Sequence, residues 1–146
     1  MSDTVFDLEG FLPYLLNQAA EAASRGFQDI YRKSYAMTRT QWRVMANLGK
    51  FGAMTARDIC AISHIEKTKV SRAILALEGV GMLARIASDK DRRVEILSLT
   101  KSGKSAFAKL GKLAQSYDAT LQAHLGQKDT SQLYSLLRRL VVLQTD

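Results

Sequence analysis

The sequence of 146 residues contains few of the residues that form disulfide bonds or bind structural metal ions. It contains one cysteine, two histidines and one proline. One cysteine forms no internal disulfide, and a zinc site built from so few Cys and His residues would need carboxylate ligands as well. The rarity of proline, with 47% hydrophobic and 24% charged residues, favours an ordered and largely helical domain that buries one core.

Several functional signatures are also missing. No run of 18 apolar residues occurs, so we expect no membrane-spanning helix and no membrane partner. The first ten residues, MSDTVFDLEG, lack the basic start and apolar core of a secretory signal, which together with the single cysteine favours a cytoplasmic protein. The sequence has no glycine-rich phosphate loop, nucleophile elbow or paired-carboxylate signature, so we expect neither an enzyme nor a cofactor.

The net charge of +7 is unevenly distributed along the chain. Residues 1–37 carry a net charge of −2, residues 38–104 carry +7, and residues 105–146 carry +2. Charge that is clustered in this way marks a surface for a polyanion. Because the basic segment also contains a folded, non-amphipathic hairpin, nucleic acid is a better partner for it than a membrane surface.

The two ends of the chain read as long helices. Apolar residues recur at spacings of three and four over residues 8–31, where Pro13 is tolerable near the first turn, and again over residues 107–125 and 133–143. Thr100 and Asp129 stand where N-caps of the last two helices are expected. The apolar surface of these helices is larger than a small central domain could cover. Ordinary packing onto that domain is one interpretation, and we favour pairing with a second copy of the chain.

The central segment contains three short helix starts. Capping-box patterns predict them within forty residues: Thr38 with Gln41, Thr55 with Asp58, and Ser63 with Glu66. The first of these helices should bury one face, made of Val44, Met45, Leu48 and Phe51. Since only a few residues separate the last two helices, the pattern predicts a helix-turn-helix.

The third short helix has two different faces. Helical periodicity places Val70, Ile74 and Leu77 together, and this side should be buried. The opposite side carries Thr68, Lys69 and Arg72, with Ser71 on its flank. Arginine reads guanine, hydroxyls contact bases or backbone, and lysine contacts phosphate. A solvated polar face is the alternative, but the position between a capped helix and a basic hairpin favours DNA contact.

After Gly79 and Gly81, either of which can end that helix, the chain becomes prone to β-structure over residues 82–87 and 92–99. Apolar residues of the second stretch lie on both faces, so the pattern does not decide which side is buried. At the tip, Arg92 and Arg93 follow Asp91, and an arginine held by a carboxylate is oriented for a narrow minor groove. A charged solvent turn is the alternative, and we favour a wing.

These motifs together resemble one family. The segments TRTQWRVMANL (38–48), TARDIC (55–60), KTKVSRAILALEGVGMLAR (67–85) and DKDRRVEILSLTKSG (89–103) are similar to the MarR family of bacterial transcription regulators, whose wing motif is D-x-x-D-R-R. Ser88 stands where the first aspartate of that motif is usual. The resemblance implies a homodimer of winged helix-turn-helix subunits, joined through terminal helices, that binds a pseudo-palindrome and responds to a small ligand or an oxidant.

We therefore expect a mainly α fold with a small β-hairpin wing, a DNA-binding lobe at residues 38–104 and a dimerisation lobe made of residues 1–37 and 105–146. The expected partners are double-stranded DNA, a second copy and a small-molecule effector. A helical dimeric interaction module that binds an acidic protein is the alternative. The candidate DNA-binding residues are Arg57, Lys67, Thr68, Lys69, Ser71, Arg72, Asp91, Arg92 and Arg93.

Other candidate chemistry is sparse. Cys60 and His64 are four residues apart, a spacing that metal ligands can use on a helix, but we favour a small buried cysteine over a metal site or a thiol sensor. Packing is also the favoured role of His124. The aromatic residues Tyr14, Tyr31, Tyr35 and Trp42 can equally be packing residues or ligand contacts.

Overall fold

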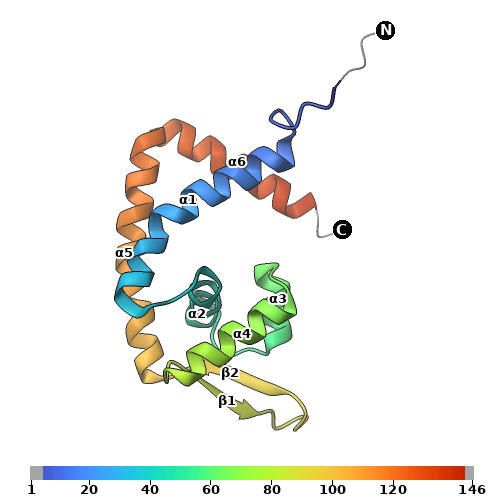
Figure 1. Ribbon diagram of the computed structural model, residues 1–146, viewed down its shortest axis with the longest axis vertical. Helices are drawn as coiled ribbons and strands as arrows, with labels where there is room; N and C mark the ends of the chain where they lie inside the picture. Colours follow the sequence, from blue (N-terminus) through green and yellow to red (C-terminus); the bar gives the residue numbers. More distant parts are fainter. Residues whose placement is uncertain (1–4, 144–146) are drawn as a thin grey trace.

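The computed structural model describes residues 5–143, which form six helices and one two-stranded antiparallel sheet. In Figure 1 the sheet and three short helices lie at one end, the first and last helices cross at the other, and α5 runs between the two ends. This confirms the expected mainly α fold with a β-hairpin. The elements are α1 (Leu12–Tyr35), α2 (Arg39–Phe51), α3 (Ala56–Ser63), α4 (Lys67–Gly79), β1 (Leu83–Ala87), β2 (Glu95–Leu99), α5 (Lys101–Leu125) and α6 (Gln127–Leu143).

Side-chain caps begin three of these helices as predicted. The capping boxes of α2 and α3 are complete: the hydroxyls of Thr38 and Thr55 accept hydrogen bonds from backbone N–H groups three residues later. Thr100 caps α5 in the same manner, accepting from the N–H of Gly103 at 3.1 Å. Each cap satisfies one of the N–H groups that a helix start leaves without a partner.

The predicted cap at Ser63 is wrong. Ser63 is the last residue of α3, and its buried hydroxyl donates to the carbonyl of Ile59 at 2.5 Å, because a serine inside a helical turn finds the carbonyl four residues earlier. His64, in the left-handed conformation, ends α3. Helix α4 then begins at Lys67, and Glu66 makes no side-chain cap bond.

Two helix boundaries and the burial of one residue also differ from the sequence-based expectation. Helix α1 begins at Leu12, so Leu8 precedes it. Gly126 alone separates α5 from α6, and Asp129 lies in the first turn of α6, where its charge favours the helix dipole, rather than before it. Phe51, expected on the buried face of α2, is 60% exposed because the helix ends there and no element covers it.

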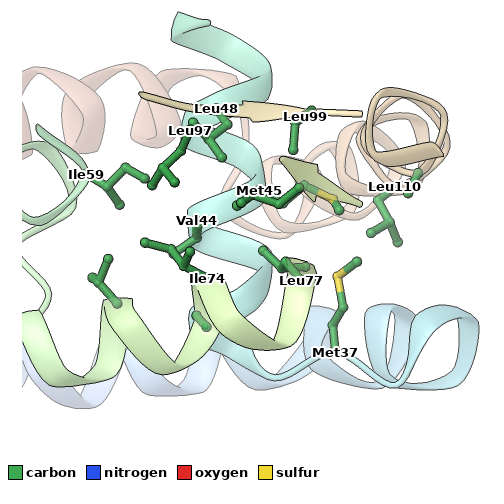
Figure 2. Packing of buried hydrophobic residues seen from close by; sticks show 14 of the residues in the cluster. Met37, Val44, Met45, Leu48, Ile59, Ile74, Leu77, Leu97, Leu99 and Leu110 are labelled. Atoms are coloured by element: carbon green, nitrogen blue, oxygen red, sulfur yellow. The ribbon is translucent and has the colours of Figure 1, made fainter. Parts of the chain in front are cut away.

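The core forms where α2, α4 and the sheet meet (Figure 2). Val70, Ile74 and Leu77 of α4 are buried as predicted, against the α2 residues Val44 and Met45. Phe27 and Tyr31 of α1 and Leu110 of α5 belong to the same cluster. The flanking helices and the central segment therefore share one hydrophobic core.

Tertiary contacts decide which face of the hairpin is buried. Leu97 and Leu99 point into the core, and Leu97 also exchanges two backbone hydrogen bonds with Met54 at 3.0 and 2.8 Å. The register runs from Leu83 opposite Leu99 to Ala87 opposite Glu95, so β2 begins at Glu95, three residues later than predicted. The intervening residues serve the turn, which the N–H of Ser88 closes on the carbonyl of Val94 at 2.8 Å.

Gly103 lies where α5 passes the helix-to-strand junction. A Cβ atom at this position would collide with the carbonyl oxygen of Met82 and approach Leu99 to 3.3 Å, whereas a Cβ on Gly111 of the same helix meets nothing within 4 Å. Because the obstacle at Gly103 is backbone, it cannot move aside as a flexible side chain would.

We predict that Gly103→Ala lowers the free energy of unfolding by roughly 1–3 kcal/mol through overpacking. The matched variant Gly111→Ala should raise it by about 0.5–1 kcal/mol, because alanine restricts the unfolded chain and favours the helix. Urea denaturation of both variants measures the two values. Equal stabilisation by both would contradict the close approach at Gly103.

Candidate nucleic-acid interface

The exposed face of α4 carries the predicted candidates. Lys67, Thr68, Lys69, Ser71 and Arg72 are all exposed within the first two turns of the helix, with Thr68, Lys69 and Arg72 opposite its buried side and Lys67 and Ser71 on the flanks. The polar residues are exposed because the apolar residues of α4 pack toward α2, which leaves the remaining positions of the helix facing solvent. The helix thus presents three cations and two hydroxyls to a partner.

A contact absent from the sequence-based analysis holds the turn before α4. Arg43, on α2, donates from Nη2 to the carbonyl of Ser63 at 2.6 Å and so satisfies the end of α3. Partial burial lowers the pKa of Arg43, and the charge of nearby Arg39 lowers it further. No local pattern could have shown this bond, since twenty residues separate its partners.

The tip of the wing is braced through its backbone. The carboxylate of Asp91 accepts from the backbone N–H of Arg93 at 3.0 Å, so the expected contact between an aspartate and an arginine side chain is corrected: the acid orders the turn, not the guanidinium. Arg92 and Arg93 are exposed and take part in none of the ion pairs found among residues 5–143. Their side chains are therefore available to a partner.

Ser88, the departure from the family's wing motif, supports the other side of this turn. Its hydroxyl accepts from the backbone N–H of Lys90 at 3.3 Å. A short polar side chain that bonds to the backbone two residues ahead is a common way to hold a turn. The serine thus takes a bracing role that an aspartate at this position would be able to fill.

A cleft of about 450 Å³ separates α4 from the wing. It brings together Arg57 from the first turn of α3, Ser71 from α4 and Arg93 from the wing, three candidates that lie far apart in the sequence. The other candidates lie outside its lining. The positively charged groups on both sides of this cleft suit a ridge of negative charge.

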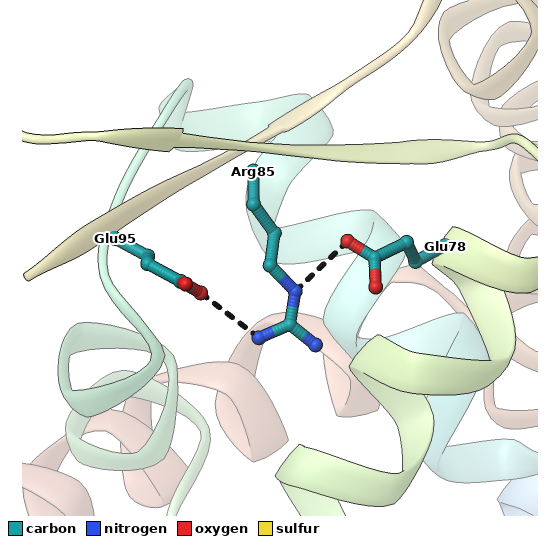
Figure 3. Close-up of polar contacts among 3 residues, drawn as sticks. All are labelled: Glu78, Arg85 and Glu95. Carbon is teal, nitrogen blue, oxygen red and sulfur yellow. Dashed lines mark hydrogen bonds and ion pairs between the residues drawn. The ribbon is translucent and has the colours of Figure 1, made fainter.

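Arg85 of β1 lines this cleft, and its guanidinium lies between Glu78 and Glu95 (Figure 3). Its Nε donates to Glu78 of α4 at 2.9 Å, and its Nη1 donates to Glu95 of β2 at 3.0 Å. The hydrogen bond to Glu95 raises the pKa of Arg85, partial desolvation opposes this, and Glu78 adds to the increase. The side chain of Arg85 is 31% exposed, and ion pairs this open contribute about 0–1 kcal/mol to stability.

A second cleft, of about 510 Å³, lies between α1, α2 and α5. Trp42, the only tryptophan of the sequence, is one of its walls, with its ring centroid 5.3 Å from that of Phe27 and stacked on Tyr31 at 6.3 Å. Arg39 and Arg43 also line it. Burial raises the pKa of the Tyr31 hydroxyl, and the charges of Arg39 and Arg32 partly oppose this increase. Aromatic walls with cations nearby suit a flat anion.

The remaining candidates are not brought together. Cys60 is partly buried and packs on the core, while His64 is an exposed helix cap and His124 is exposed in the last turn of α5. The expected packing of His124 is therefore absent within one chain. Residues 5–143 contain no group of three or more His, Cys, Asp and Glu residues able to hold a metal ion, and no helix in that range could cross a membrane.

Comparisons with known proteins agree with this geometry. Residues 37–94 match the profile of the MarR family. The chain is 27% identical over 130 residues to the HTH-type transcriptional regulator FarR of Neisseria gonorrhoeae, and the match covers 88% of each protein. It also resembles the crystal structure of the MarR family transcriptional regulator SPO1453 from Silicibacter pomeroyi, with a TM-score of 0.82, 27% identity, and coverage of 95% of this chain and 98% of that one.

The fold is likewise that of BpsR from Bordetella bronchiseptica, whose DNA binding is regulated by 6-hydroxynicotinic acid, with a TM-score of 0.83, 22% identity, and coverage of 97% of this chain and 99% of that one. Relatives of this kind are transcription regulators and not enzymes. The capped helix-turn-helix, the outward basic face of α4, the hairpin wing and these similarities agree: residues 37–94 match the MarR family, and the chain as a whole resembles winged helix-turn-helix transcription regulators of that family.

Proposed function

We propose that this protein is a sequence-specific DNA-binding repressor that acts as a homodimer and releases its operator when it binds an aromatic acid. The observation that carries the proposal is the exposed polar face of α4, held opposite a buried apolar face and beside a wing whose tip arginines, Arg92 and Arg93, form no ion pair among the described residues. Helix α4 enters the major groove, and the wing reaches the flanking minor groove.

Each candidate has a role in this arrangement. Arg72 and Thr68 meet base edges, while Lys67, Lys69, Ser71 and Arg57 meet phosphates. Arg92 and Arg93 reach the minor groove, and Asp91 orders the turn that carries them. In a dimer, two copies of α4 would enter major grooves about 34 Å apart, one turn of B-DNA.

We predict that Arg72→Ala weakens binding to the selected operator by roughly 1–3 kcal/mol and relaxes selectivity at one base pair. Lys69→Ala should instead weaken binding to all sequences similarly and flatten the dependence on salt by about one unit of slope. The test is selection from random duplexes, then salt-matched titrations, with Lys109→Ala on α5 as the control. Wild-type binding that selects no sequence would instead favour the module that binds an acidic protein.

The dimer is supported by apolar surface that a single chain leaves open. More than half of the surface of each of four leucines is exposed: 51% for Leu12, 54% for Leu15, 52% for Leu136 and 68% for Leu143. A groove of about 420 Å³ between α1 and α6 is lined almost wholly by leucines, with Arg139 as the exception. A second copy offers a matching apolar surface by symmetry.

We predict that Leu136→Asp raises the dimer dissociation constant about thirtyfold or more, since a carboxylate replaces an apolar contact in the interface. Phe51→Asp is the control, because Phe51 is equally exposed but lies on α2, away from these helices. Sedimentation equilibrium measures both constants. A Leu136→Asp protein that stays as dimeric as the control would place the interface elsewhere.

The effector site is the cleft that Trp42 and Arg43 line. An acid bound there would compete for the guanidinium of Arg43, which holds the carbonyl of Ser63 before α4. Binding in this cleft would therefore act on the turn that places the recognition helix. The acid that regulates BpsR supplies a probe of the right chemistry.

We predict that 6-hydroxynicotinate changes the fluorescence of Trp42 in a saturable manner, whereas the neutral 6-hydroxynicotinamide binds at least about tenfold more weakly because it lacks the charge that pairs with arginine. Arg43→Met should remove this preference for the acid. Benzoate serves as a second aromatic acid. If neither acid gives a saturable change, the cleft does not bind this class of effector.

A further inference from the structure

One guanidinium joins the recognition helix to both strands of the wing. Arg85 lies on β1, and its two carboxylate partners lie on α4 and β2. In the strand register Arg85 is opposite Leu97, so Glu95 is its diagonal neighbour, two residues along on the same face of the hairpin. Figure 3 shows the guanidinium lying between Glu78 and Glu95. The three side chains therefore cross-link three elements at the inner end of the cleft between α4 and the wing.

The two carboxylates of this cluster need Arg85 as a partner. Glu78 lies near the C-terminal end of α4, where the helix dipole disfavours a carboxylate, and the last turn of α4 contains no basic residue. Arg85 supplies that missing positive charge from the neighbouring strand. The cluster as a whole has one net negative charge, which would repel DNA, so electrostatic attraction to DNA does not account for it.

The arginines around the cleft divide into two groups. Arg57, Arg85 and Arg93 all line it, but of these only Arg85 takes part in an ion pair within the described residues. Its five N–H donors form a planar fork that suits two acceptors at a fixed angle. Arg85 is thus committed to holding protein elements, while Arg57 and Arg93 remain available to DNA.

The position of the wing tip depends on the angle between the wing and α4. Strand β1 continues for only two residues beyond Arg85, and the turn of residues 88–94 then carries Arg92 and Arg93. A change in the angle of the hairpin at Arg85 would therefore displace these two arginines from a minor groove that is only about 6 Å wide. The sheet is held by burial of Leu83, Leu97 and Leu99 and by the two backbone hydrogen bonds between Leu97 and Met54, and Arg85 adds a directional side-chain contact to α4.

We propose that Arg85 is a positioning residue for DNA recognition: held by Glu78 and Glu95, it fixes the angle between the wing and α4. Arg92 and Arg93 then reach their groove in register with the helix residues. This inference rests on the proposed function, because it concerns how the same interface is aligned. It adds a residue that does not touch DNA and acts through those that do.

The double variant Glu78→Gln and Glu95→Gln tests the proposal by the sign of its effect. Removing two negative charges beside the interface should strengthen DNA binding if only electrostatics matter. The positioning role predicts the opposite, about tenfold weaker binding to the operator, because the wing loses its register. Glu66→Gln, which removes an exposed carboxylate at the start of α4 that makes no cap bond, is the matched control and should bind DNA as well as wild type or better.

A double-mutant cycle shows through which residue Arg85 acts. Arg85→Met keeps the aliphatic stem and removes the fork, and we expect it to weaken operator binding about tenfold with no change in the slope against salt. In an Arg93→Ala background the further loss from Arg85→Met should vanish, whereas in a Lys69→Ala background it should persist. Additive effects with Arg93→Ala, or a salt slope flattened by about one, would make Arg85 a direct DNA contact and overturn the proposal.

Folding and function are separated by two controls. Melting temperature and circular dichroism of each variant show whether the protein folds, and Arg85→Lys, which keeps the charge but not the fork, should recover only part of the operator affinity. If wild type selects no operator, the proposed function itself fails. If wild type selects an operator and the Glu78→Gln and Glu95→Gln protein binds it as tightly, only the role of Arg85 fails.

Discussion

The burial of one face of α4 is the constraint on which the rest of the structure depends. Val70, Ile74 and Leu77 are almost wholly inaccessible because they pack on α2 and the sheet. Since side chains are fixed around the helix at about 100° intervals, burying these three turns Thr68, Lys69 and Arg72 outward. The proposed DNA-binding face is therefore a consequence of core packing, and it needs no separate interaction to point it away from the protein.

Burial in the core holds α4 in place, and directional polar contacts set its orientation relative to the neighbouring elements. Apolar burial holds α4 on α2, and the hydrogen bond from Arg43 to the carbonyl of Ser63 sets how the preceding turn meets that helix. At the other end of α4, Arg85 contacts both Glu78 and Glu95. Arginines thus tie the turn before the helix to α2 and the end of the helix to the hairpin, through contacts whose energies are small and whose geometry is specific.

The cleft that Trp42 lines is built from residues that also belong to the core. Phe27 and Tyr31 are buried in the main cluster, and their rings form the aromatic contacts around Trp42. Arg43 lines the same cleft and also holds the carbonyl of Ser63. A cleft whose walls are core residues is mechanically connected to α2, because interiors are closely packed and transmit displacement. The proposed effector response follows from this shared construction.

Local sequence pattern is enough to determine much of this fold. The capping boxes at Thr38 and Thr55, the two faces of α4 and the existence of a hairpin are all effects within one element, so neighbouring residues suffice to predict them. The exposed candidates on α4 follow from the same periodicity. The clustering of positive charge in residues 38–104 indicated the kind of partner.

Only the tertiary structure decided what depends on residues that are distant in the chain. Ser63 satisfied the spacing of a cap, yet its hydroxyl bonds back to Ile59 because the end of α3 is buried under α2. Leu97 and Leu99 face inward because Met54 and helices α2, α3 and α5 contact β2. The sequence by itself determined which faces exist. Packing between elements decided which were covered, because burial belongs to pairs of surfaces and not to a single segment.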